Sequence, residues 1–242
     1  MICYFASVIF VSSCSAELTI TLYTLMIYEM EYNAKQLQII NVAERLFAGK
    51  GFSGTSIRDI AHEAEINVSM ISYYFGSKER LIEALFEVRS VESSTRMETI
   101  ISNDDLTPIQ KIYILIDGAI ERLMGNQCFH NIMLREQLSG EDRTQIISDL
   151  IFELKYKNWE GLDTIIKEGQ LKGDFREDIN ISLLSATLYG TVNQVITTQA
   201  FFKKINNLEH LTQEEFEKDL KLKLSKHLKS IFKATVAYET IE

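Results

Sequence analysis

The chain of 242 residues is 46% hydrophobic, contains a single proline and carries a net charge of −9. A chain of this length holds one large domain, or a small domain joined to a larger one. Scarce proline favours helices, because proline interrupts their hydrogen-bond ladder. The acidic balance argues against non-specific binding to nucleic acid, so any DNA-binding function would depend on locally placed bases.

Cysteine and histidine residues are too dispersed to indicate a metal centre or a disulfide framework. They are Cys3, Cys14, Cys128, His62, His130, His210 and His227. An odd number of cysteines cannot pair fully, which fits a reducing cytoplasm better than secretion. The sequence has no visible catalytic triad, paired-carboxylate signature or glycine-rich phosphate motif. We therefore predict no enzyme, no cofactor and no metal.

The first 29 residues are apolar but lack the features of a targeting signal. The first basic residue is Lys35, so the positive region that opens a signal peptide is absent. Glu17 divides the segment into two runs, each shorter than the ~20 residues of a membrane span. We interpret residues 1–29 as a non-native or disordered extension and Met30 as the biological start. A lipid-attached or membrane-associated segment at Cys14 and an additional ordered element are the alternatives.

A first helix is predicted from Asn33 to about Lys50. Its apolar residues recur at helical spacing and are Ile39, Ile40, Ala43, Leu46 and Phe47. Gly51 can take the left-handed conformation that closes a helix end, and Phe52 behind it can pack back on the last turn.

Two short helices follow, separated by a tight turn. The first begins after Thr55 or Ser56, since both residue types cap helices well. Its apolar stripe consists of Ile57, Ile60, Ala61 and Ala64. Asn67 caps the second helix, residues 68–75. The residues expected to be buried in that helix and in the longer helix after it are Ile71, Phe75, Leu81 and Leu85. Two short helices joined in this way form a helix-turn-helix at about residues 55–74.

The segment TSIRDIAHEAEINVSMISYYFGSKERL resembles the DNA-binding motif of the TetR (tetracycline repressor) family of bacterial transcriptional regulators. The matching positions are Thr55, Ile60, Ala61, Ala64, Ile66, Tyr74, Phe75, Ser77, Lys78 and Leu81. The resemblance covers residues 34–85. It departs from the family pattern at Glu65, where glycine is usual, and at Ser72, where tyrosine is commonest.

This resemblance implies an all-α protein with two domains. Residues 32–92 would form an N-terminal three-helix helix-turn-helix DNA-binding domain, and residues 93–242 a C-terminal helical ligand-binding and dimerisation domain. The protein would be a dimeric, cytoplasmic, sequence-specific transcriptional regulator without a membrane partner, most simply a repressor released by a small-molecule effector. The alternative is an all-helical enzyme or adaptor that uses the C-terminal cavity without binding DNA.

By the same resemblance, the helix of residues 68–75 enters the major groove of double-stranded DNA at an inverted-repeat operator. Phosphate contacts are expected from Thr55, Ser56, Tyr74 and Lys78, and base-edge contacts from Ser69, Met70 and Tyr73. The predicted DNA-binding set is completed by Asn67, Val68 and Ser72. Three alternatives stay open: the tyrosines form a local core, Lys78 is a solvated surface lysine, and Val68 faces the core instead of the DNA.

The rest of the chain is predicted to be helical nearly throughout. Pro108 suits the first turn of a helix that runs to about Met124. Further helices are expected near residues 129–138, 142–168 and 181–202. A final helix begins at a capping box formed by Thr212 and Glu215.

Residues 183–201 are apolar or small on most faces, so we expect this helix to be covered on several sides. The resemblance implies a homodimer through the last two helices. This segment would then lie beside a stripe of Leu220, Leu224 and Leu228 at the interface. A core helix within one chain is the alternative.

The resemblance also implies a pocket in the C-terminal domain for a largely apolar effector. Its candidate lining residues are Tyr113, Phe129, Met133, Tyr156, Trp159, Tyr189 and Asn193. Aromatic residues at helical spacing are more often simple packing, so each of these residues has a core position as its alternative.

Overall fold

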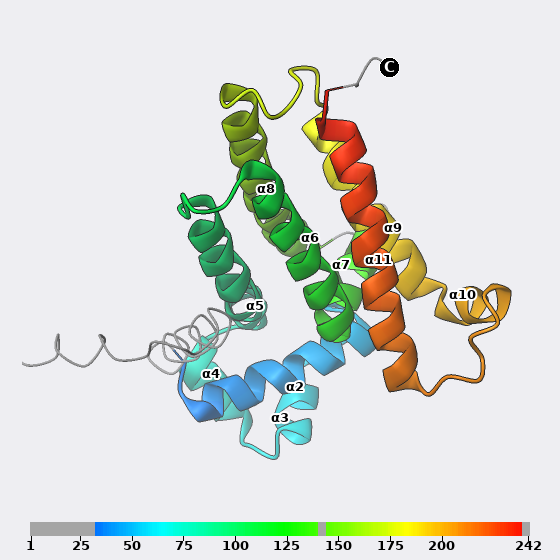
Figure 1. The fold of residues 1–242 in the computed structure, drawn as a ribbon. Coiled ribbons are helices and arrows are strands. Elements are labelled where there is room, and N and C mark those ends of the chain that lie inside the picture. The colour runs from blue at the N-terminus through cyan, green and yellow to red at the C-terminus, as the bar shows by residue number, and fades with distance from the viewer. Residues whose placement is uncertain (1–31, 140–143, 239–242) are drawn as a thin grey trace, which may run out of the picture. The chain divides into compact units, whose positions relative to one another are not determined.

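The computed structural model describes residues 32–139 and 144–238, so the predicted extension at residues 1–29 lies outside the described residues. The described helices are α2 (Ala34–Lys50), α3 (Ile57–Glu63), α4 (Val68–Phe75), α5 (Lys78–Ile101), α6 (Pro108–Gly125), α7 (Gln127–Leu138), α8 (Gln145–Leu171), α9 (Ile181–Thr197), α10 (Gln199–Ile205) and α11 (Gln213–Val236). Within these ranges there is no strand. The predicted all-α class is confirmed (Figure 1).

The chain divides into two compact units. The first contains Ser56–Arg96 and the described residues up to Ala43, and the second contains Glu44–Thr55 and the described residues from Met97 onward. The division after Arg96 lies four residues beyond the predicted boundary at residue 92. It also assigns the second half of α2 to the second unit. The helix α5 begins in the first unit and ends in the second.

The end of α2 follows the local rules of helix closure. Gly51 has a positive φ of 78°, which a residue without Cβ adopts at little cost. The ring of Phe52 lies 5.4 Å from that of Phe47, between centroids. Both features confirm the predicted closure of the first helix.

In the second unit, α6 lies between α8 and α11 (Figure 1), and α9 packs against all three. Pro108 occupies the first turn of α6 after a Thr107 capping box, as predicted for Pro108. The Thr212–Glu215 capping box of α11 is also confirmed. The core of this unit is formed by apolar residues of α6, α8, α9 and α11.

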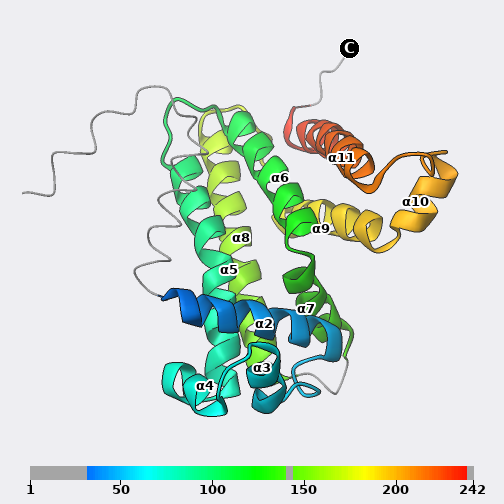
Figure 2. The same ribbon diagram turned by 90° about the horizontal axis from the view of Figure 1, so that it is seen from below.

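Two expectations for this unit are corrected. The leucine stripe Leu220, Leu224 and Leu228 is buried in the core of the unit, so it leaves no apolar surface for a second copy. The helix expected at 181–202 ends at Thr197, and α10 extends from its end (Figure 2). The hydroxyls of Thr197 and Thr198 bond to the carbonyls of Asn193 and Gln194, and such back-bonding often bends helices.

No helix within the described residues has both the length and the apolar character that a membrane crossing requires.

Candidate functional site

The helix α3 is held at its first turn by a reciprocal capping box. The backbone N–H of Asp59 donates to Ser56 Oγ at 3.1 Å, and the backbone N–H of Ser56 donates to Asp59 Oδ2 at 2.8 Å. Ser56 is exposed beside these bonds. The capping satisfies two backbone donors that would otherwise be unpaired at the helix start.

The turn between α3 and α4 has a left-handed residue where the helix closes. The backbone N–H of Ile66 donates to the Ala61 carbonyl at 3.0 Å, and that of Glu65 to the His62 carbonyl at 3.2 Å. These are the two bonds of a Schellman motif, whose first residue after the cap is usually glycine. Glu65 occupies that position with φ of 53°. Glutamate at this position departs from the family pattern, but the turn keeps both backbone hydrogen bonds of the Schellman motif.

The helix α4 presents one buried and one exposed face. Ile71 and Phe75 are buried, as predicted. Tyr73 is 84% exposed and Val68 is 39% exposed, so neither residue belongs to the core. Asn67 caps the helix by accepting from the backbone N–H of Ser69 at 2.9 Å. The exposed face carries hydroxyl, phenol and methyl groups, which are the groups that read base edges.

The remaining members of the predicted DNA-binding set lie around this face. Ser69 and Ser72 are exposed, and Met70 and Tyr74 are partly exposed. The Tyr74 ring lies 5.2 Å from the Tyr73 ring in an edge-on arrangement. Lys78 starts α5 and is partly exposed. Since α4 itself carries no charged side chain, the cationic group nearest to it in sequence is Lys78.

The structure corrects the prediction that Thr55 contacts a DNA phosphate. Its side chain is 1% exposed. Its hydroxyl donates to the Gly51 carbonyl at 2.8 Å and to the Leu46 carbonyl at 3.2 Å, and its backbone N–H donates to Phe52. With both donors used inside the protein, Thr55 stabilises the loop before α3 and lies outside the exposed set.

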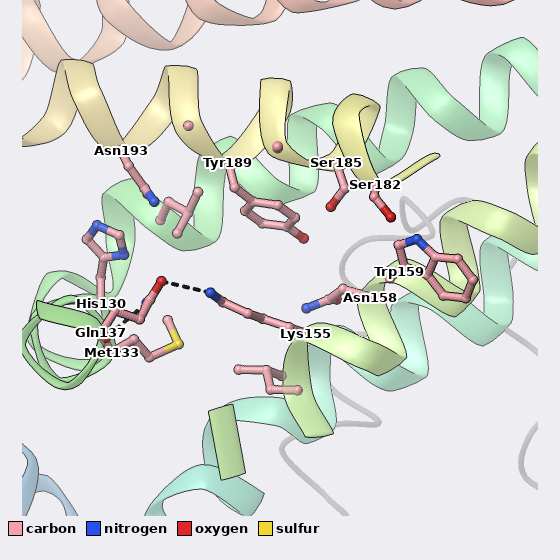
Figure 3. Close-up of a pocket in the computed structure, with 14 residues that line it drawn as sticks. His130, Met133, Gln137, Lys155, Asn158, Trp159, Ser182, Ser185, Tyr189 and Asn193 are labelled. Atoms are coloured by element: carbon pink, nitrogen blue, oxygen red, sulfur yellow. Dashed lines mark hydrogen bonds between the residues drawn. The ribbon is translucent and has the colours of Figure 1, made fainter. Parts of the chain in front are cut away.

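The second unit contains a cavity of about 430 Å³ (Figure 3). It is lined by Leu123, His130, Met133, Gln137, Leu154, Lys155, Asn158, Trp159, Ser182, Ser185, Ala186, Tyr189, Gly190 and Asn193. These residues come from α6, α7, α8 and α9. A volume of this size is within the range of small-molecule sites.

Four of the seven predicted effector residues line this cavity: Met133, Trp159, Tyr189 and Asn193. The other three, Tyr113, Phe129 and Tyr156, do not line it. Phe129 is buried in the protein, and Tyr113 packs against the core. Tyr156 is exposed on α8 and stacks between the rings of Phe152 and Trp159.

Sequence reasoning missed most of the polar lining. The missed polar residues are His130, Gln137, Lys155, Asn158, Ser182 and Ser185. A selection based on aromatic and apolar residues could not find them. Helical spacing was an available signal, since Lys155 is four residues from Trp159 and Ser185 is four residues from Tyr189.

Several polar atoms in the cavity have no hydrogen-bond partner within the described residues. They are both ring nitrogens of His130, Nε1 of Trp159 and Oδ1 of Asn193. Buried polar atoms in proteins are normally paired. These atoms belong to residues that line the cavity, which makes them candidate partners for a bound polar group.

The charge of the cavity lining is positive. The ammonium of Lys155 donates to Oε1 of Gln137 at 2.7 Å across the cavity (Figure 3), and the lining contains no carboxylate. Burial lowers the pKa of the Lys155 ammonium and of the His130 imidazole. The Lys155 side chain is nevertheless exposed as a whole, and an anionic group beside it would favour its charged form.

No group of three or more histidine, cysteine, aspartate or glutamate side chains is arranged to hold a metal ion in the described part of the chain. The arrangement of the cavity therefore suits binding of an organic molecule with an apolar body and a polar or anionic end.

Comparisons with known proteins find matches for both the helix-turn-helix region and the C-terminal helical region. Residues 39–85 match the model of bacterial regulatory proteins of the tetR family, and residues 93–221 match that of the C-terminal region of YsiA-like proteins. The chain is 27% identical over 164 residues to the fatty acid metabolism regulator protein of Bacillus subtilis, covering 68% of this chain and 82% of the relative. It is 31% identical over 144 residues to the HTH-type transcriptional repressor NicS of Pseudomonas putida, covering 60% and 67%.

Solved structures share the fold. The regulator FadR of Bacillus subtilis in complex with stearoyl-CoA aligns with a TM-score of 0.58 and 24% identity over 80% of this chain and 97% of that chain. The ketosteroid regulator KstR2 of Mycobacterium tuberculosis aligns with a TM-score of 0.62 and 16% identity over 86% of this chain and 98% of that chain.

Proposed function

Because the chain belongs to the TetR family of bacterial regulatory proteins, we propose that this transcriptional regulator is a dimeric repressor whose effector is an acyl compound with an anionic end. The repressor binds an inverted-repeat operator and leaves it when the effector fills the cavity of the second unit. The observation that carries the effector class is the apolar cavity with a lysine and no carboxylate in its lining.

The proposed DNA-binding surface is the exposed face of α4 together with the starts of α3 and α5. Tyr73, Ser69 and Met70 meet base edges, while Ser56, Tyr74 and Lys78 contact phosphates. Asn67, Val68 and Ser72 border these contacts. The exposure of Tyr73 and the capped starts of both short helices support this assignment.

Base-edge contacts and phosphate contacts can be distinguished by how the DNA affinity depends on salt. We expect Lys78→Ala to weaken operator and scrambled DNA about equally and to reduce the salt slope by about one unit per half-site. Tyr73→Ala should instead cost more on the operator than on scrambled DNA. Lys204→Ala, an exposed lysine of the second unit, is the charge-matched control. Loss of sequence preference in Lys78→Ala with full preference in Tyr73→Ala would reverse the assignment.

The acyl effector is supported by the cavity and by the relatives. The cavity offers apolar walls, unpartnered polar atoms and the Lys155 ammonium. A relative is named for fatty acid metabolism, and a structure of the same fold contains stearoyl-CoA. An acyl chain would fill the apolar part, and its anionic end would approach Lys155.

This effector class is testable with stearoyl-CoA, stearate and uncharged stearyl alcohol. Trp159, the single tryptophan of the chain, lines the cavity and reports binding by its fluorescence. We expect the two anionic probes to quench Trp159 and to release operator DNA. Lys155→Gln should weaken both anionic probes and leave the alcohol unchanged, because it removes the cation and keeps a polar side chain. Lys157→Gln, an exposed neighbour outside the lining, is the control. Equal effects on all three probes would contradict a role for Lys155 charge.

The proposed homodimer uses the outer faces of α9 and α11. Leu183 on α9 and Leu222 on α11 are each 66% exposed, although the inner leucines of α11 are buried. Exposed leucines on the two helices favour burial against a second copy. Light scattering should give a dimer for the native chain and a monomer for Leu183→Glu with Leu222→Glu. Leu171→Glu, at a still more exposed leucine that ends α8, is the control and should remain dimeric.

A further inference from the structure

A second, much smaller cavity lies behind the effector cavity, within the same unit. The two cavities share three lining residues, Asn158, Ser185 and Tyr189. The smaller one measures about 20 Å³, and its other lining residues are Met97, Ile112, Leu115, Ile116, Arg122, Leu162, Leu188 and Phe232. Such a volume holds about one water molecule. It admits the end of an apolar chain only if a lining side chain moves.

Tyr189 is the bulkiest side chain in the shared wall. Its ring projects from α9 into the effector cavity, and its hydroxyl end lies toward Ser185 and Asn158 (Figure 3). Burial raises the pKa of the Tyr189 phenol, and the nearby Arg122 guanidinium partly offsets that rise. Arg122 also lines the smaller cavity. A group that passes from one cavity to the other has to turn the Tyr189 ring.

Met97, in the last turns of α5, lines the smaller cavity and does not line the larger one. Its thioether packs against the backbone of α8 at Gly161, where an added Cβ would come within 2.5 Å of Met97 Sδ. The contact therefore depends on glycine at that position. Methionine has three rotatable side-chain bonds, so Met97 is able to withdraw and enlarge the cavity.

We infer that Tyr189 selects effectors by the length of their apolar end. An effector whose apolar end passes Tyr189 occupies the smaller cavity, displaces Met97 from Gly161 and so shifts the end of α5. A shorter effector fills the main cavity without this displacement and leaves DNA bound. The inference rests on the proposed acyl effector and adds which acyl compounds act and through which contact.

The first test compares octanoyl-CoA with stearoyl-CoA, reading Trp159 fluorescence for binding and operator anisotropy for release. Both probes should quench Trp159, but stearoyl-CoA should release DNA at a concentration at least tenfold lower. Tyr189→Phe keeps the ring and removes the hydroxyl near the Arg122 guanidinium. The ring should then turn more easily, so the stearoyl-CoA concentration for half-release should fall several-fold. The octanoyl-CoA response should stay the same.

Tyr113→Phe is the matched control, because Tyr113 lines neither cavity. It should change neither response. Equal shifts for both probes in Tyr189→Phe, or the same shift in the control, would overturn selection by Tyr189. If neither probe quenches Trp159, the acyl effector class is wrong and the selection fails with it.

The second test includes a measurement without any effector, whose outcome does not depend on whether the proposed acyl effector class is right. Gly161→Ala inserts a methyl group where Met97 Sδ packs, and it should weaken operator binding at least about fivefold without any probe. Gly125→Ala, at a helical glycine with open space around its Cβ position, should bind normally. Met97→Ala should keep stearoyl-CoA quenching and lose DNA release. Folding is verified by circular dichroism. Normal operator binding by folded Gly161→Ala, or normal release by Met97→Ala, would refute transmission through this contact.

Discussion

The turn between α3 and α4 predicts that Glu65→Gly stabilises the first unit. Glu65 has φ of 53°, and a left-handed conformation costs an L-residue about 1–2 kcal/mol. Glycine avoids this cost but loses about 0.5–1 kcal/mol through its larger unfolded-state freedom. The expected net gain in the free energy of unfolding is therefore about 0.5–1 kcal/mol. In a chain of this size it corresponds to a rise in Tm of about 1–4 °C.

Urea unfolding followed by circular dichroism measures this gain. Glu65→Ala is the matched variant, because it removes the same carboxylate while keeping a Cβ at positive φ. The glycine variant should be more stable than the alanine variant by at least about 0.5 kcal/mol. The backbone bonds from Ile66 to Ala61 and from Glu65 to His62 remain available in both. Equal stabilities of the two variants would refute the assignment of strain to this residue.

Three further predictions concern named contacts. Ser56→Ala removes the capping box with Asp59 and should lower the free energy of unfolding by about 1 kcal/mol in urea. The buried ammonium of Lys111 donates to Glu168 and to the last carbonyl of α5, each at 2.8 Å. Lys111→Met should therefore cost about 2–3 kcal/mol, and adding Glu168→Gln should recover part of it. Burial lowers the pKa of His130, so the unfolded chain binds its proton more readily. Stability is then present above pH 6.5 and falls as pH decreases below it, and His130→Asn should reduce that fall between pH 7.5 and 5.5.

The elements that the sequence predicted well are those fixed by neighbours in the chain. Asn67, Pro108 and the Thr212–Glu215 capping box act within one helical turn, so their pattern is visible in a short window. The buried face of α4 follows from four-residue spacing alone. Glu65 was recognised as unusual because a glycine position in a helix closure is also local.

Features that depend on residues distant in sequence were predicted less well. Thr55 was expected to contact phosphate, yet it is buried, and its hydroxyl donates to the Leu46 carbonyl in the preceding helix. Phe129 and Tyr113 are aromatic, like several residues that line the cavity. However, Phe129 is buried and Tyr113 packs against the core. Lys155 enters the cavity because α7 and α8 bring Gln137 within hydrogen-bond distance. Periodicity identifies a buried face but cannot distinguish a filled interior from a hollow one.

The charge distribution connects DNA binding to dimerisation. Residues 30–82 contain six basic and six acidic side chains, so the DNA-binding part of the chain has no net attraction for phosphate. The face of α4 is uncharged, and few cationic contacts per half-site give weak binding with a shallow dependence on salt. Two linked half-sites raise affinity because the second contact becomes intramolecular. A chain with Leu183→Glu and Leu222→Glu should therefore lose operator binding although α4 is intact. Retention of native affinity by a verified monomer would show that one copy of α4 suffices.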